Sequence, residues 1–195
     1  MTGVILSGGK NTRMGTNKAF IEINGERLID RTVKLFKGIF DEVIIVTNAP
    51  LPYLDLNVTI VSDVIKGKGA LGGIYSGIFY AASSHCFIAA CDMPFLNEAF
   101  IKYMVENIEH YDIVVPEKVS KPIGWMEPLH AVYSRNCLPP IRNLLKKNEL
   151  KISALYRGLN VRLIPEKTVK EFDPQDQMFL NVNTKEDLER IEAPS

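Results

Sequence analysis

Apolar runs alternate along the chain with stretches whose apolar positions recur every three or four residues. Several runs, such as the one within Glu42–Thr47, are continuously apolar, which is typical of strands buried on both faces of a parallel sheet. We expect strands at Gly3–Leu6, Glu42–Thr47, Val58–Ser62, Cys86–Ala90, Asp112–Pro116, Leu129–Ser134, Val161–Ile164 and Met178–Asn181.

Helices are expected between these strands, at Arg27–Lys37, Gly72–Ala82, Glu98–His110 and Cys137–Lys147. Asn97 and Asn136 stand where the third and fourth helices need an N-cap. Thr184 and Asp187 have the spacing of a capping box for a final short helix.

Alternating strands and helices predict an α/β fold, a Rossmann-like three-layer sandwich with a mostly parallel sheet. A chain of 195 residues is long enough for one well-buried core. It contains no repeat, low-complexity tract or linker, so we expect a single domain over residues 1–195.

Composition excludes several classes of function. The formal net charge is zero, which argues against a general nucleic-acid or anionic-membrane binder. No apolar run approaches the roughly 20 residues of a membrane-spanning helix. Because the first residues show no cationic lead and no long apolar core, we expect no secretory signal and a cytoplasmic protein.

The three cysteines are an odd and sparse set, and we expect buried free thiols rather than disulfides or metal ligands. The histidines show no metal-binding spacing. His130, on an apolar strand, is expected to be a packed residue rather than a general base.

Candidate chemistry begins directly after the first expected strand, in the segment from Leu6 to Lys18. Gly8 and Gly9 let backbone N–H groups approach a ligand, while Lys10, Arg13 and Lys18 supply cations in a stretch without acids. Amides and fixed positive charge at a strand end suit a polyphosphate. A solvated surface turn is the alternative. A Walker A loop is excluded, because its glycine and lysine spacing cannot be aligned here.

The pattern Gly8-Gly9-x-x-x-Arg13-Met14-Gly15-x-x-Lys18 resembles the signature of nucleotidyltransferases, and most closely that of the molybdenum cofactor guanylyltransferases. Ser7 and Asn17 replace the alanine and aspartate that are usual in that family. The resemblance extends from Gly3 to about Leu188. It implies an enzyme that binds GTP, transfers GMP to the phosphate of molybdenum-loaded molybdopterin, and releases pyrophosphate.

The resemblance also implies residue roles. Arg13 and Lys18 would be the catalytic cations, with Asp92 as both catalytic residue and Mg²⁺ ligand. Magnesium is commonly held by one or two carboxylates together with phosphate oxygens, although Asp92 could instead start the following turn. The nucleotide would be bound by Leu6, Ser7, Gly8, Gly9, Lys18, Asn48, Asp63 and Asp92.

Base recognition is assigned to two residues at strand ends. Guanine presents two adjacent donors, which a carboxylate such as that of Asp63 can accept. Asn48 occupies a position where the family also has asparagine. For both residues, a purely structural role in a turn is the alternative.

Two segments resemble the acceptor side of the family, namely Glu127–Tyr133 and Phe179–Thr184. Within the second, Asn181 and Asn183 would contact the acceptor through neutral amides, and capping of a strand end or helix start is the alternative. Partner proteins would be molybdoenzymes or their chaperones.

A rival motif is Gly67-x-Gly69-x-x-Gly72, which has the spacing of a dinucleotide-binding loop. Residues 63–66 separate it from the preceding strand, which removes the tight turn that such a loop requires. Three more functions are compatible with the sequence: cytidylyl transfer to molybdopterin, guanylyl transfer to another phosphorylated acceptor, and GTP sensing without catalysis.

Overall fold

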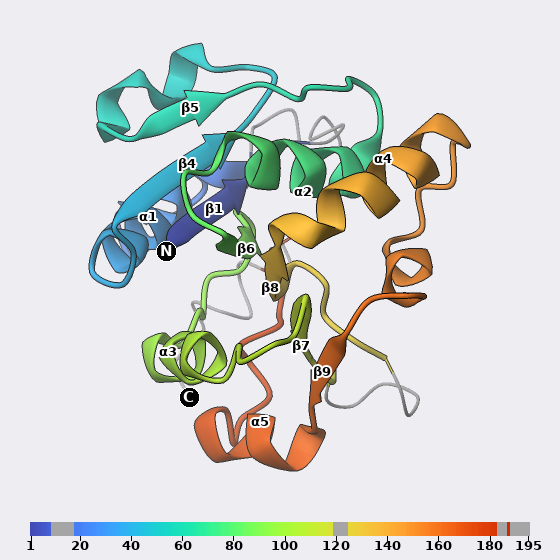
Figure 1. The fold of residues 1–195 in the computed structure, drawn as a ribbon. Helices are drawn as coiled ribbons and strands as arrows, with labels where there is room; N and C mark the ends of the chain where they lie inside the picture. The colour runs from blue at the N-terminus through green and yellow to red at the C-terminus, as the bar shows by residue number, and fades with distance from the viewer. Residues whose placement is uncertain (9–17, 119–124, 183–186, 188–195) are drawn as a thin grey trace.

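The computed structural model describes residues 1–8, 18–118, 125–182 and 187. Its centre is a seven-stranded sheet of order β5-β4-β1-β6-β8-β7-β9 (Figure 1). The strands are β1 (Thr2–Leu6), β4 (Glu42–Val46), β5 (Thr59–Val61), β6 (His85–Ala90), β7 (Ile113–Pro116), β8 (His130–Ser134) and β9 (Val161–Ile164). β8 pairs antiparallel with β6 and β7, whereas the other pairings are parallel. The expected α/β fold with a mostly parallel sheet is confirmed.

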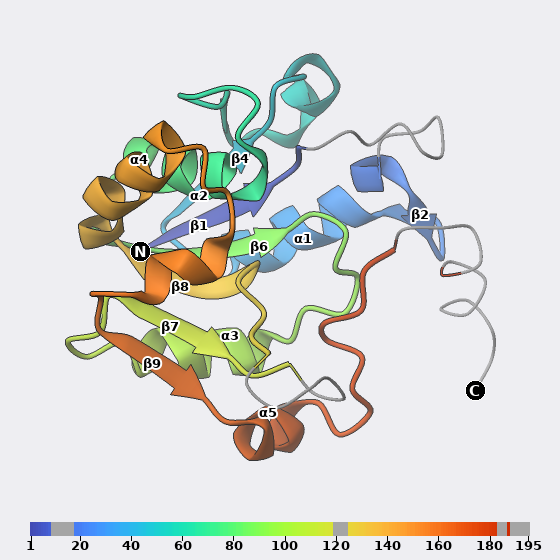
Figure 2. The same cartoon turned by 90° about the vertical axis from the view of Figure 1, so that its right-hand side faces the viewer.

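Helices cover both faces of the sheet, giving three layers (Figure 2). They are α1 (Leu28–Lys37), α2 (Gly69–Tyr80), α3 (Glu98–Glu106), α4 (Leu138–Lys146) and α5 (Glu166–Phe172). Apolar residues of α1, α3 and α5 pack on one face, and those of α2 and α4 pack on the other. Alternate residues of β1 divide between these layers: Ile5 belongs to the first cluster, Val4 and Leu6 to the second. A small antiparallel pair, β2 (Glu22–Ile23) and β3 (Glu26–Arg27), precedes α1.

Helix α2 lies very close to β1, and its glycines explain why. A Cβ added at Gly77 would stand 2.6 Å from a methyl carbon of Val4, and one added at Gly73 would stand 3.3 Å from Leu6. The absence of side chains at these positions lets the helix approach the strand directly. The first turn of α2 consequently lies at the same edge of the sheet as the end of β1.

The expected strand at Met178–Asn181 is wrong. The backbone amides of Gln177 and Met178 donate to the carboxylate of Asp173, at 3.0 and 2.8 Å. The amide of Leu180 turns back to the carbonyl of Gln177. These groups are therefore satisfied locally and pair with no strand of the described residues.

Two helix expectations also need correction. Helix α3 does not reach His110 but ends at Glu106. Glu109 has a φ of +45°, a value outside the right-handed helical region, so the helix cannot continue through it. Asn97 caps α3 as expected, accepting from the amide of Phe100 at 3.0 Å. Asn136 is not the cap of α4. Ser134 caps a 3₁₀ turn there, and Asn136 donates to Asp112.

The expected capping box from Thr184 to Asp187 involves residues outside the described part of the chain. Within the described residues, no helix is long and apolar enough to cross a membrane.

Candidate active site

A cavity of about 560 Å³ opens at the carboxyl ends of the parallel strands. Successive strand exits contribute to its walls: Leu6 and Gly8 after β1, residues 46–48 after β4, Asp63 after β5, and residues 90–92 after β6. The start of α2 supplies Gly67, Gly69, Ala70 and Gly73. The strand exits with candidate chemistry therefore converge on one place, as expected for ligand sites in open α/β sheets.

The first wall is the exit of β1. The amide of Ser7 still pairs with the sheet, donating to the carbonyl of Val46 at 2.9 Å. The side chain of Ser7 is buried behind the cavity instead of lining it. Gly8 faces the cavity, and a Cβ built there would meet nothing within 4 Å. The cavity therefore has room for a ligand beside the backbone of Gly8. Gly9 and Arg13 lie outside the described residues.

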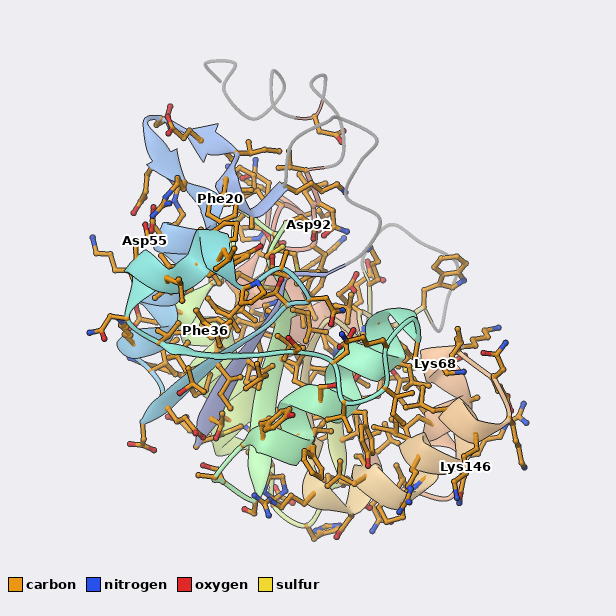
Figure 3. All side chains as sticks on the ribbon, turned by 90° about the horizontal axis from the view of Figure 1, so that it is seen from above. Phe20, Phe36, Asp55, Lys68, Asp92 and Lys146 are labelled. Atoms are coloured by element: carbon orange, nitrogen blue, oxygen red, sulfur yellow. The ribbon has the colours of Figure 1, made fainter. Side chains whose placement is uncertain are left out.

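Lys18 and Asp92 face each other in the cavity. The Nζ atom of Lys18 lies 3.5 Å from Oδ2 of Asp92, and the two side chains are 17% and 20% exposed. Lys18 begins a 3₁₀ turn, Lys18–Phe20, whereas Asp92 follows the exit of β6. The amide of Cys91 donates to the carbonyl of Leu6 at 3.1 Å, extending the sheet register to the residue before Asp92. Figure 3, viewed from above, shows Asp92 between Phe20 and the start of α2 near Lys68.

Beside Lys18, the cavity offers a divalent cation one carboxylate, that of Asp92. Asp92 carries oxygen ligands of the type that Mg²⁺ prefers, and it lines the cavity partly exposed. Among the described residues, no group of three or more His, Cys, Asp or Glu side chains could hold a metal. This donor set fits a cation that takes its remaining ligands from substrate phosphates and water.

Asn48 and Asp63 form a reciprocal pair on the opposite wall. The amide nitrogen of the Asn48 side chain donates to Oδ2 of Asp63 at 2.7 Å. In return, Oδ1 of Asn48 accepts from the backbone amide of Asp63 at 3.3 Å. The pair fixes the orientation of both side chains. Asp63 keeps its other carboxylate oxygen, and Asn48 its second amide hydrogen, for a ligand.

The glycine segment that resembles a dinucleotide loop lies beside this pair. Gly67 and Gly69 have φ values of +73° and +58°, a region that disfavours side chains. Lys68, between them, donates from Nζ to the side-chain oxygen of Asn148 at 2.9 Å. The start of α2 thus lines the cavity through Gly67, Gly69 and Ala70, and the contact with Asn148 ties it to the loop after α4.

The second acceptor-side segment reaches the site through its backbone. The amide of Val182 donates to the carbonyl of Asp92 at 2.9 Å. The side chain of Val182 is buried against Ile21, Ile23 and Leu28. Asn181 precedes this contact and is not among the residues that line the cavity. Asn183 lies outside the described residues.

His130 is a packed residue, as expected from the sequence. Its ring is buried against Phe87, Phe100 and Phe179, with ring centroids 5.0 to 5.6 Å apart. Neither ring nitrogen has a hydrogen-bond partner among the described residues. Burial lowers the pKa of His130 to about 3, so the imidazole is neutral at neutral pH.

The cysteines are buried free thiols, again as expected. Burial raises the pKa of Cys86, Cys91 and Cys137 to about 12. Thiols with such pKa values contain almost no thiolate near pH 7 and are poor nucleophiles.

Some residues of the site were not anticipated. Leu129 and Leu150 add apolar surface to the cavity, and no sequence signal distinguishes them from core leucines. Tyr53, in the 3₁₀ helix Leu51–Leu56, contacts Ser7 through its hydroxyl. Its neighbours in the sequence are leucine and proline, so no motif marks it.

Comparison with known proteins agrees with this geometry. A model of the MobA-like NTP transferase domain matches residues 3–163. The chain is 45% identical over 195 residues to a molybdenum cofactor guanylyltransferase from Desulfosudis oleivorans, covering 99% of this chain and 95% of that protein. It is 39% identical over 191 residues to a probable molybdenum cofactor guanylyltransferase from Peptoclostridium acidaminophilum, covering 96% and 86%.

Solved structures show the same fold. The structure of molybdopterin-guanine dinucleotide biosynthesis protein A from Archaeoglobus fulgidus superposes with a TM-score of 0.82 at 25% identity, covering 98% of this chain and 97% of that one. These matches decide against a dinucleotide-binding loop as the interpretation of the glycine segment. The chain belongs to the MobA-like NTP transferase family and is a nucleotidyltransferase.

Proposed function

We propose that the protein transfers GMP from GTP to the terminal phosphate of molybdenum-loaded molybdopterin. The facing pair of Lys18 and Asp92, 3.5 Å apart in the cavity, is the observation that carries this proposal. The high identity to proteins named molybdenum cofactor guanylyltransferase supports the choice of nucleotide and acceptor.

The chemistry is a substitution at phosphorus. An oxygen of the acceptor phosphate attacks the α-phosphorus of GTP, and the bond from that phosphorus to the bridging oxygen of the β-phosphate breaks. Pyrophosphate leaves with the bonding electron pair, and a new diphosphate links the acceptor to GMP. A phosphate acceptor is already ionised at neutral pH, so the reaction needs no strong base. His130, whose ring is packed among phenylalanine rings, is therefore not needed as a base.

The residues of the cavity have separate tasks in this reaction. The backbone amide of Gly8 and the ammonium of Lys18, both at the cavity wall, bind the phosphates and offset the negative charge that grows on the leaving group. Arg13 belongs to the same proposal, although it lies outside the described residues. Asp92 would hold Mg²⁺, which when bound neutralises phosphate charge. Because Lys18 contacts the same carboxylate, it would move from Asp92 toward the phosphates when the nucleotide binds.

Asp63 and Asn48 would read the base. The carboxylate of Asp63 accepts from the two adjacent donors of guanine, and Asn48 holds that carboxylate in place. Cytosine presents one exocyclic amine and an acceptor ring nitrogen on the same edge, so an ionised carboxylate favours guanine. The segment with Asn181 and Asn183 would contact the acceptor, since its backbone is joined to Asp92. The product would pass to a molybdoenzyme or its chaperone in the cytoplasm.

A pyrophosphate-release assay over GTP, CTP, ATP and UTP tests the proposal. We expect Mg²⁺-dependent release with GTP only when molybdopterin is present. Release with CTP instead would indicate a cytidylyltransferase. Release from GTP with another phosphorylated acceptor would reassign the acceptor. GTP binding without release would identify a nucleotide sensor.

A further inference from the structure

Residues 9–17 are flanked on both sides by contacts to one side chain, that of Tyr53. On the amino-terminal side, the hydroxyl groups of Ser7 and Tyr53 lie 2.5 Å apart. On the carboxyl-terminal side, the ring of Phe20 packs against the ring of Tyr53, with centroids 4.9 Å apart and an angle of 54° between the planes. Phe20 ends the same 3₁₀ turn that Lys18 begins.

Both contacts are shielded from water. Tyr53 is 0% exposed and Ser7 is 3% exposed, so their hydrogen bond cannot be exchanged for one to solvent without moving the backbone. Breaking this bond in a buried place would therefore cost free energy. The geometry therefore strongly favours one arrangement of Ser7 relative to Tyr53.

The 3₁₀ helix that carries Tyr53 is itself anchored to the helix layer. Asp55 accepts from the guanidinium of Arg27 at 2.6 Å. The carbonyl of Leu56 accepts from Nζ of Lys37, at the end of α1, at 3.1 Å. The Arg27 guanidinium also lies over the ring of Phe20, 5.5 Å from its centroid. In the view of Figure 3, Phe20 lies between Asp55 and Asp92.

We propose that Tyr53 is a positioning residue, which holds Ser7, next to Gly8, through its hydroxyl and holds Phe20, in the turn that Lys18 begins, through its ring. This inference rests on the proposed function, because it assumes that Gly8 and Lys18 bind the phosphates of GTP. Ser7 fixes the exit that presents Gly8, and Phe20 fixes the turn that presents Lys18. Tyr53 thus sets the distance between the amide and the ammonium before the nucleotide arrives.

Preorganisation has a measurable consequence. A site whose flanks are already fixed loses less conformational freedom on binding, and the affinity is higher for that reason.

The test compares Tyr53→Phe, Ser7→Ala and the double variant by calorimetric titration with GTP and Mg²⁺, in the absence of acceptor. Tyr53→Phe keeps the ring contact with Phe20 and removes only the hydroxyl. Each single variant should raise the dissociation constant of GTP about three- to tenfold, the range expected for one neutral hydrogen bond. The double variant should be no weaker than the weaker single variant, because both substitutions remove the same bond.

Ser134→Ala is the matched control. Ser134 is also buried, and its hydroxyl donates to Oδ1 of Asp112 at 3.1 Å. It pairs with His85 at the start of β6, at the edge of the sheet away from the cavity. The variant should lower Tm at least as much as Tyr53→Phe does and leave the GTP dissociation constant unchanged. A merely structural role for Tyr53 predicts equal loss of Tm and no change in GTP affinity.

The outcomes separate the two proposals. The positioning role of Tyr53 would be overturned if Tyr53→Phe and Ser7→Ala bound GTP as tightly as the wild type does. It would also be overturned if the increases in the GTP dissociation constant multiplied in the double variant. Tight GTP binding by the wild type without pyrophosphate release would overturn the proposed function. In that case, the GTP dissociation constants of the variants would still test the positioning role of Tyr53. A wild-type protein that does not bind GTP would overturn both.

Discussion

The ammonium nitrogen of Lys18 lies 3.5 Å from the Asp92 carboxylate, although 74 positions separate the two residues along the chain. The parallel pairing of β1 with β6 brings the exits of both strands to one edge, where Asp92 meets the 3₁₀ turn that Lys18 begins. Each group is about four-fifths buried and lines the cavity. The arrangement keeps a carboxylate and a cation ready for opposite partners, a metal ion and a phosphate.

Replacing Asp92 should remove most of the activity. Without the carboxylate, the metal loses its protein ligand, and Asp92→Asn should lower the rate of GMP transfer about a hundredfold or more. Asp92→Cys should be equally impaired with Mg²⁺ and partly restored by Mn²⁺ or Cd²⁺, since softer cations accept a thiolate. Initial rates of pyrophosphate release measure both effects.

The control for that series is Glu98→Gln, which removes a carboxylate from an exposed ion pair with Lys102 on α3. It should leave the rate within twofold. Equal activity of Asp92→Asn and the wild type would show that the carboxylate does not hold the catalytic metal.

Asp63 should control the preference for guanine over hypoxanthine. ITP lacks the exocyclic amine of GTP, so a carboxylate that accepts from this amine discriminates against ITP. Wild-type protein should prefer GTP over ITP about tenfold or more in kcat/KM, which corresponds to one hydrogen bond to a charged group. Asp63→Ala should reduce the ratio to near one, and Asn48→Ala, which only frees Asp63, should reduce it partly. An unchanged ratio in Asp63→Ala would place the base elsewhere.

The close approach of α2 to β1 predicts a stability effect. Gly77→Ala would place a methyl group 2.6 Å from Val4, and the overpacking should lower the free energy of unfolding by about 1–3 kcal/mol. Gly73→Ala meets Leu6 at 3.3 Å, near the movable end of a flexible side chain, and should be milder. Urea unfolding followed by circular dichroism gives both values. The reverse order would mean that the helix does not rest on Val4.

His130 should make stability depend on pH. Its pKa is about 3 when folded, against an ordinary value of 6.5, so the unfolded chain binds more protons between these pH values. The free energy of unfolding should therefore fall as the pH drops below 6.5, by about 1.4 kcal/mol per pH unit from this residue. His130→Phe keeps an aromatic ring among Phe87, Phe100 and Phe179. It should abolish the contribution of His130 to the pH dependence of the free energy of unfolding.

Because carboxylates also titrate in this range, the informative quantity is the difference between wild type and His130→Phe at pH 7 and pH 5. A difference that does not change with pH would show that His130 is not buried in its neutral form.

Much of this fold could be predicted from the sequence because its strands are buried on both faces. Such strands leave continuous apolar runs, and the sheet strands β1, β4 and β6 appear at the expected positions. The run at Met178–Asn181 failed for a tertiary reason: the Asp173 carboxylate captures the amides of Gln177 and Met178. A hydrogen bond between a side chain and a backbone amide produces no repeating pattern of apolar residues, so the sequence does not reveal it.

The candidate site likewise has one part that could be predicted from the sequence and one part that could not. Leu6, Gly8, Lys18, Asn48, Asp63 and Asp92 line the cavity, and the rule that ligands bind beyond strand ends was enough to group them. The pairing of Asn48 with Asp63 and the bond between Ser7 and Tyr53 were not foreseeable, because they depend on the path of the chain after β4. Lining the cavity does not test a role, so the roles assigned to the residues that line it stay predictions, as do those of Ser7, Gly9, Arg13, Asn181 and Asn183.

The proposed mechanism requires that Gly8 and Lys18 bind the phosphates of GTP opposite a Mg²⁺ ion held by Asp92. A crystal structure of the complex with Mg²⁺ and a non-hydrolysable GTP analogue would show whether they do. We expect phosphate oxygens within hydrogen-bond distance of the Gly8 amide and of Nζ of Lys18, and an Asp92 oxygen within about 2.1 Å of the ion. A triphosphate bound away from Gly8, or an ion without Asp92 in its coordination shell, would refute this mechanism.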